Sequence, residues 1–265
     1  MRKLDLAQAL AEAFGHLEAN RVGEAKRLAR DLERAQPSLP GLRYLQGLVA
    51  MAEGDGRKAA QSLAKALAQT PDAVPPLLAM ARAQALQQRH GPAEMAYLRL
   101  IALSPALAEA YDELGALYLA CGRMEAAVGS LDRATTVRPK GAGAWYRLGI
   151  AQRSLGHWEA AARSFAQTIA VDDKHAKAYA SLAGVLRRLK RASESVGVAR
   201  QAVRLEPAEA SHWLELGQAE REGGDLDAAV AAFREVMRLA SDDIEALWLS
   251  AECLNALGRQ DDAVA

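Results

Sequence analysis

The chain repeats one pattern every 34 residues, and this period constrains its fold more than any other feature of the sequence. Residues 108–141 show the pattern most clearly: apolar side chains recur at three- and four-residue steps over 109–120 and again over 125–137. Such steps are typical of one face of a helix. Pro139 follows, and a proline disfavours helical geometry in the residue before it. The unit therefore predicts two short helices joined by a tight turn.

Three positions of this unit recur at the same period along the chain. The first two hold only small side chains, which we predict to lie where the paired helices cross, as at Gly115 and Ala127. The third holds the proline that ends the unit, and only Asp173 and Ser241 replace it. The three series are Ala25, Ala59, Ala93, Ala127, Ala161, Ser195, Ala229 and Ala263; Ala13, Gly47, Ala81, Gly115, Gly149, Ala183, Gly217 and Ala251; and Pro37, Pro71, Pro105, Pro139 and Pro207.

A helix–turn–helix unit of 34 residues, with small residues at the crossing and a proline at the end, resembles the tetratricopeptide repeat (TPR) family. The resemblance implies an all-α fold, namely a right-handed superhelical solenoid of about fifteen helices without a sheet. Because each repeat of a solenoid contacts only its neighbours, we expect a single domain over residues 1–265. The predicted repeats are 6–39, 40–73, 74–107, 108–141, 142–175, 176–209, 210–243 and a partial repeat over 244–265.

Three stretches depart from the unit. Arg43 and Gln46 occupy two places that are usually apolar, so we expect looser packing in the second repeat. Lys190 stands where the neighbouring repeats have a turn glycine. The second helix of the first repeat, over 23–34, is rich in charged residues, which predicts a solvated outer surface.

Composition limits the classes of function. Lys+Arg and Asp+Glu both number 33, and a net charge of zero argues against a general nucleic-acid-binding protein. No apolar run approaches the length of a membrane span, and Asp5 and Glu12 interrupt any signal-peptide core. The two cysteines, Cys121 and Cys253, lie on distant repeats and suit free thiols in a reducing compartment. We therefore expect a cytoplasmic protein, and the alanine- and arginine-rich composition indicates a bacterial source.

Catalytic chemistry has no visible basis in the sequence. The five histidines occupy different places within the repeat, and no two of them stand at metal-ligand spacing. No Cys-X-X-Cys motif is present. Glycine clusters fall at predicted turns, whereas a phosphate-binding loop would follow a strand. We predict that the protein is not an enzyme and has no catalytic residue, metal site or cofactor.

Function is therefore expected on the concave face. The resemblance implies that the second, fifth, ninth and twelfth places of each repeat line this face, and here they change from apolar to charged along the chain. Arg153, Arg187 and Arg221 are one period apart and should form a ladder of cations that focuses a positive potential, unless they are simply solvated. The candidate partner-binding residues are Leu10, Phe14, Tyr44, Leu48, Met51, Leu78, Asp112, Tyr146, Arg153, Lys177, Arg187 and Arg221.

We interpret the chain as a non-catalytic scaffold whose concave groove binds a peptide or protein segment with an apolar anchor and acidic or phosphorylated residues. The asparagines that chaperone-binding TPR domains and O-GlcNAc transferases use are absent from the matching places, which disfavours both specialisations. The alternative is the N-terminal targeting region of a longer bacterial enzyme, of glycosyltransferase or sulfotransferase type, with its catalytic domain beyond residue 265. We also expect that Ala265 is not a natural end, and that the incomplete last repeat either frays or pairs end to end with a second copy.

Overall fold

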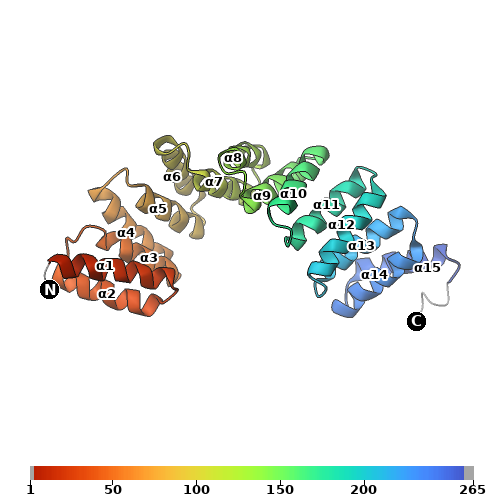
Figure 1. Ribbon diagram of the computed structural model, residues 1–265, viewed down its shortest axis with the longest axis horizontal. Coiled ribbons are helices and arrows are strands. Elements are labelled where there is room, and N and C mark those ends of the chain that lie inside the picture. The colour runs from red at the N-terminus through yellow and green to blue at the C-terminus, as the bar shows by residue number, and fades with distance from the viewer. Residues whose placement is uncertain (1–2, 260–265) are drawn as a thin grey trace. The chain divides into compact units, whose positions relative to one another are not determined.

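The computed structural model describes residues 3–259, and all regular structure in that range is helical (Figure 1). Fifteen helices and no strand occur there, which confirms the predicted all-α repeat fold. The predictions for Ala263 and for the end of the eighth repeat lie outside the described residues. The helices are α1 (Lys3–Glu18), α2 (Val22–Ala35), α3 (Leu42–Ala52), α4 (Gly56–Gln69), α5 (Val74–Leu86), α6 (His90–Leu103), α7 (Ala108–Ala120), α8 (Met124–Val137), α9 (Ala142–Ser154), α10 (Trp158–Val171), α11 (Ala176–Arg188), α12 (Ala192–Leu205), α13 (Ala210–Gly223), α14 (Leu226–Leu239) and α15 (Ile244–Ala256).

The chain divides into two compact units, Met1–Cys121 with α1 to α7 and Gly122–Ala265 with α8 to α15. Within each unit, every helix packs against the next one along the chain. The boundary falls in the turn of the fourth repeat, between α7 and α8. One continuous solenoid over residues 1–265 stays a prediction from the repeat.

Burial of the small residues confirms the register of the repeat. Every described member of the first series, from Ala25 to Ala229, has no exposed surface. Within the hairpins of the second, fifth and seventh repeats, the glycine of the first helix faces a large side chain of the second. A Cβ added at Gly149 would lie 2.6 Å from the Phe165 ring, and one added at Gly217 would lie 2.5 Å from Phe233. The close approach of the two backbones therefore requires glycine at these places.

Each hairpin turn contains one residue in the left-handed region, at the same place of every repeat. Glycine holds this place in five repeats, from Gly54 (φ 77°) to Gly258 (φ 73°). Asn20, Gln88 and Lys190 hold it in the other three, with φ of 56°, 57° and 61°. A left-handed residue commonly ends a helix, and glycine adopts that conformation without steric cost. The fold therefore imposes the turn geometry even where the sequence lacks glycine.

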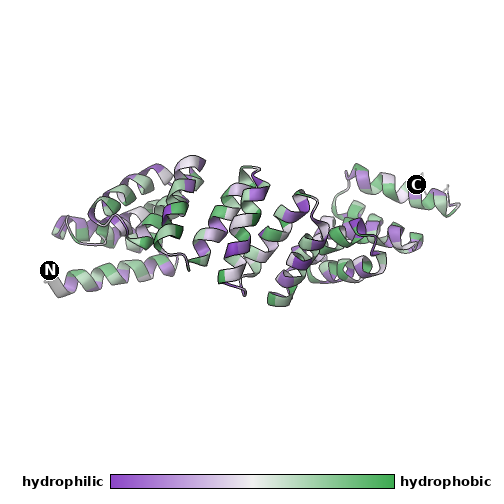
Figure 2. Ribbon diagram, turned by 90° about the horizontal axis from the view of Figure 1, so that it is seen from above, coloured by the Kyte–Doolittle hydropathy of each residue, from purple (hydrophilic) through white to green (hydrophobic). Residues whose placement is uncertain are grey.

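Apolar residues are distributed over all the helices. Figure 2 shows hydrophobic and hydrophilic residues mixed within individual helices, as expected when each helix buries one stripe against its neighbours. Indole groups fix some junctions between repeats: Trp145 and Trp213 donate hydrogen bonds of 2.8 Å to the carbonyl oxygens of Pro139 and Pro207. Between residues 3 and 259, no helix has both the length and the apolar composition that a membrane span requires.

Candidate functional site

In the first unit, five of the predicted inner-face residues are half-buried and pack against the core. Leu10 and Phe14 contact the hydrophobic cluster formed by α1 to α3, and Tyr44, Leu48 and Met51 contact the cluster of α3 to α5. The rings of Phe14 and Tyr44 lie 5.7 Å apart, which joins the first two repeats. These five side chains therefore support the repeat packing while keeping part of their surface exposed.

Two of the predicted residues do not lie on an exposed face. Leu78 is only 9% exposed and Asp112 only 8%. Both belong to helices, α5 and α7, whose buried residues lie on nearly all sides of the helix. A helix whose buried residues lie on most of its sides leaves little surface for a ligand. The expectation that these two side chains face a groove is therefore corrected.

The second unit brings three predicted residues together. Tyr146, Arg153 and Lys177 line one open depression of about 430 Å³ formed by α9, α11 and α13. They come from the fifth and sixth repeats, and the seventh repeat completes the wall. The other lining residues are Ala180, Ser181, Glu209, Ser211, His212, Leu214 and Glu215.

The charged groups of this depression differ in their pairing. Glu215 accepts a hydrogen bond of 2.9 Å from Nη1 of Arg187, and Glu209 accepts one of 2.9 Å from the Ser211 hydroxyl. Arg153 and Lys177 are exposed, and neither has an ion pair with any described residue. Both carboxylates thus accept a hydrogen bond within the protein. The charge of Arg153 acts on Glu215, but neither Arg153 nor Lys177 forms a direct ion pair among the described residues.

An apolar wall stands beside these cations. The Tyr146 ring lies 5.7 Å from the Phe165 ring and 4.7 Å from the His175 ring, which fixes its position. Leu214 is half-buried in the same wall. His212 is 2% exposed and lies at a place where the fourth, fifth, sixth and eighth repeats have alanine. The depression therefore offers an apolar surface next to two cationic side chains.

Arg187 and Arg221 form ion pairs within the protein, whereas we expected the three arginines to form a ladder that binds a ligand. Arg187 is 16% exposed and binds Glu215, Glu222 at 3.1 Å and the amide oxygen of Gln218. Arg221 binds Glu252 at 2.6 Å. These acceptors belong to the first helix of the following repeat. The guanidinium groups therefore join neighbouring repeats.

Sequence spacing could have shown this difference. The carboxylates paired with Arg187 and Arg221 follow them by 28 to 35 residues. At the corresponding places after Arg153, the chain has Ser181, Gly184 and Arg188. Arg153 is therefore the member of the ladder for which the next repeat supplies no carboxylate.

Sequence reasoning also missed a polar network in the first unit. Nε of Arg82 donates to Glu113 at 2.9 Å, and the same guanidinium binds Glu109. The Tyr97 hydroxyl donates to Glu113 at 2.9 Å. Hydrogen bonding to Glu113 raises the pKa of Arg82, while burial, followed by the Glu113 charge, raises the pKa of Tyr97. Arg82 occupies the ninth place of its repeat, so part of the inner face is structural here.

Side chains that could hold a metal ion do not gather in the structure as described. Over residues 3–259, no three His, Cys, Asp or Glu side chains lie close enough together to hold a metal ion. Cys121 is exposed and Cys253 is buried, and both are free thiols.

Comparison with known proteins decides the family. Residues 72–265 match the family model described as cilia and flagella-associated protein 70 C-terminal domain, and residues 4–74 match the tetratricopeptide repeat model. The chain belongs to the tetratricopeptide repeat family. No curated protein matches this TPR chain in sequence.

Several solved TPR structures share its fold at low sequence identity. The C-terminal part of a TPR protein from Cytophaga hutchinsonii is 14% identical, with a TM-score of 0.73 over 91% of this chain and 98% of that one. YrrB, described as a TPR protein with an unusual peptide-binding site, is 16% identical, with a TM-score of 0.65 over 72% of this chain and 98% of its own. MamA is 20% identical, with a TM-score of 0.60 over 65% of this chain and 94% of its own. TPR proteins are generally non-catalytic scaffolds for protein–protein interaction, and this chain has their fold.

Proposed function

We propose that this protein is an interaction scaffold whose second unit binds a peptide segment with acidic side chains beside an apolar one. The binding place is the depression at Tyr146, Arg153 and Lys177. The observation that carries the proposal is the contrast in hydrogen bonding within it: Glu209 and Glu215 each accept a hydrogen bond from the protein, whereas Arg153 and Lys177 form no ion pair with any described residue. A ligand carboxylate or phosphate would supply charge-assisted hydrogen bonds to Arg153 and Lys177.

The apolar wall determines the second feature of the ligand. Tyr146 and Leu214 present half-buried apolar surface beside the cations, and aromatic side chains are favoured anchors in binding sites. An apolar ligand side chain would lie against them while its acidic neighbour reaches the cations. The description of YrrB as peptide-binding supports a peptide as the occupant of such a fold.

Selection from a displayed random peptide library tests the proposal. We expect the complete chain to enrich peptides with Asp or Glu next to an apolar residue, and the Arg153→Gln/Lys177→Gln variant to lose that enrichment. The matched control is Arg163→Gln/Lys174→Gln, which removes the same charge from exposed residues of the same unit outside the depression. Enrichment of the same peptides by the depression variant, or of peptides without acidic residues by the wild type, would reject the assignment.

A further inference from the structure

A second cavity lies in the first unit, between the first two repeats. It measures about 300 Å³ and is formed by α2, α3 and α4. At 100° per residue, the residues of α3 that line it lie on the opposite side of that helix from Tyr44, Leu48 and Met51. We call it the basic cleft; its lining residues are Lys26, Ala29, Arg30, Glu33, Arg43, Gln46, Val49, Ala50, Glu53, Lys58, Gln61, Ser62 and Lys65.

Polar side chains line the basic cleft at positions where later repeats have packed hydrophobic side chains. Four of its lining positions hold Lys26, Arg43, Gln46 and Ser62. Five periods later, the same positions hold side chains that pack in one hydrophobic cluster: Val196, Trp213, Leu216 and Ala232. Four periods later, three of them again contribute to such a cluster: Ala162, Leu182 and Val198. The cleft lies where Arg43 and Gln46 predict looser packing. Because these polar side chains give up apolar contacts, a role other than packing would explain their presence.

Positive charge dominates the basic cleft. Five cationic side chains and two carboxylates line it, although the whole chain has a net charge of zero. The carboxylates are already paired: Glu53 binds Lys26, and Glu33 accepts a hydrogen bond of 2.8 Å from Arg43. The hydrogen bond from Arg43 lowers the pKa of Glu33. Arg30, Lys58 and Lys65 form no direct ion pair with any described residue, although the charge of Lys65 also acts on Glu33.

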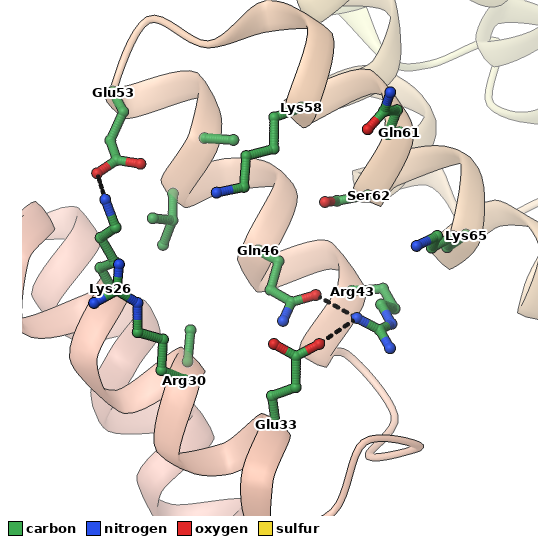
Figure 3. A pocket seen from close by; sticks show the side chains of 13 residues that line it. Lys26, Arg30, Glu33, Arg43, Gln46, Glu53, Lys58, Gln61, Ser62 and Lys65 are labelled. Carbon is green, nitrogen blue, oxygen red and sulfur yellow. Dashed lines mark hydrogen bonds and ion pairs between the residues drawn. The ribbon is translucent and has the colours of Figure 1, made fainter.

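The unpaired cations stand on two walls of the opening. Lys58, Ser62 and Lys65 extend from α4 towards α2 and α3, as Figure 3 shows. Arg30 belongs to α2, on the other wall. The lining also includes Ala29 and Ala50, whose short side chains leave room for a ligand.

We propose that the basic cleft binds a phosphoryl group. A phosphate monoester has close to two negative charges and several acceptor oxygens, so it can accept hydrogen bonds from both walls at once. Lysine ammonium groups bind phosphate as point charges, and the Ser62 hydroxyl is a further donor. Arg43, the residue best suited to a planar carboxylate, is already held by Glu33. This site lies in the other unit from the proposed peptide site, so either proposal can fail alone.

Titration of the complete chain, followed by amide NMR, tests this site with three probes. The probes are inorganic phosphate, a short peptide with one phosphoserine, and the same peptide without phosphate. We expect signals of α2 and α4 to shift with at least one phosphorylated probe and not with the unphosphorylated peptide. A response to the phosphopeptide alone would indicate a phosphorylated protein as the source, whereas an equal response to inorganic phosphate would indicate a small molecule.

Matched variants complete the test. Lys58→Gln/Lys65→Gln should weaken binding of the responding probe at least about tenfold, because two charge-assisted hydrogen bonds are removed. The control Arg27→Gln/Arg57→Gln removes one exposed cation from α2 and one from α4, both outside the cleft, and should bind like the wild type. Unchanged circular dichroism in both variants shows that the fold is retained. No response to either phosphorylated probe, or equal weakening in both variants, would overturn the proposal.

Discussion

At the scale of single residues, the neighbours of each charge determine whether it can serve a ligand. Arg153, Arg187 and Arg221 occupy the same place of successive repeats, yet only Arg153 lacks an ion pair among the described residues. Periodicity predicts that they are equivalent, because it describes position along the helix. The carboxylates of the next repeat make them different, and a series that follows one place of the repeat does not include those carboxylates.

Glu215 gives a prediction about pH at this scale. Burial raises its pKa even though the charges of Arg187 and Arg153 oppose the shift. A raised pKa in the folded state contributes stability below the ordinary carboxyl range, near pH 4, and this contribution is lost as the pH rises through the folded value. The free energy of unfolding of the wild type, minus that of Glu215→Gln, should therefore fall as the pH rises above about 4 and through the raised pKa of Glu215. Urea unfolding at several pH values measures it; a difference that rises with pH would mean that Arg187 dominates.

Glycine at the helix crossing gives a prediction about packing. In Gly217→Ala, the new Cβ would meet the buried Phe233 ring at 2.5 Å, so we expect a loss of about 1–3 kcal/mol in the free energy of unfolding. The matched control is Gly197→Ala in α12, where a Cβ meets nothing within 4 Å. Helix propensity should make this control more stable by about 0.5–1 kcal/mol. Chemical denaturation compares the two, and equal effects would contradict the assigned crossing.

At the scale of helices and turns, the repeat predicts the buried helix faces better than it predicts the turns. The small-residue series predicts which helix faces are buried, and the structure confirms it from Ala25 to Ala229. The turn is less visible in the sequence, because Asn20, Gln88 and Lys190 replace glycine in three repeats. The cavity of the basic cleft was also not foreseen, since a sequence pattern can predict loose packing but not the volume that results.

Lys190 tests the cost of that turn. Its φ of 61° lies in the left-handed region, where a residue with a Cβ costs roughly 1–2 kcal/mol. Lys190→Gly should therefore raise the free energy of unfolding by about 1 kcal/mol, and Gly156→Lys, its counterpart one repeat earlier, should lower it by a similar amount. Thermal or urea unfolding measures both changes. A destabilised Lys190→Gly protein would show that the lysine side chain outweighs the backbone strain.

At the scale of the whole molecule, the repeat predicts the family but not the division into two units. The boundary lies at Cys121, inside the repeat from which the period is most easily recognised, and no change of composition marks it. The two proposed sites are distributed over the units in the same unforeseen way. The depression in the second unit gathers predicted residues, whereas the basic cleft uses the other side of the first helix.

Exposed apolar residues of α15 give a prediction about association. Ile244, Leu247 and Trp248 are 80%, 56% and 62% exposed, which is unusual for large apolar side chains. We expect copies of this chain to associate through α15, and Leu247→Glu/Trp248→Glu to prevent it by placing charge on that face. Sedimentation equilibrium over a range of concentrations measures the mass. A wild-type protein that stays monomeric at every concentration would contradict this prediction.

The affinity of a library-selected peptide for the depression tests the central claim most directly. Isothermal titration should give binding to the wild type that weakens as salt rises from about 50 to 500 mM, because both cations are solvent-exposed. Arg153→Gln/Lys177→Gln should bind at least about tenfold more weakly and with less dependence on salt. Arg163→Gln/Lys174→Gln should bind like the wild type. Equal affinity and equal salt dependence in all three proteins would contradict the assignment of the binding site.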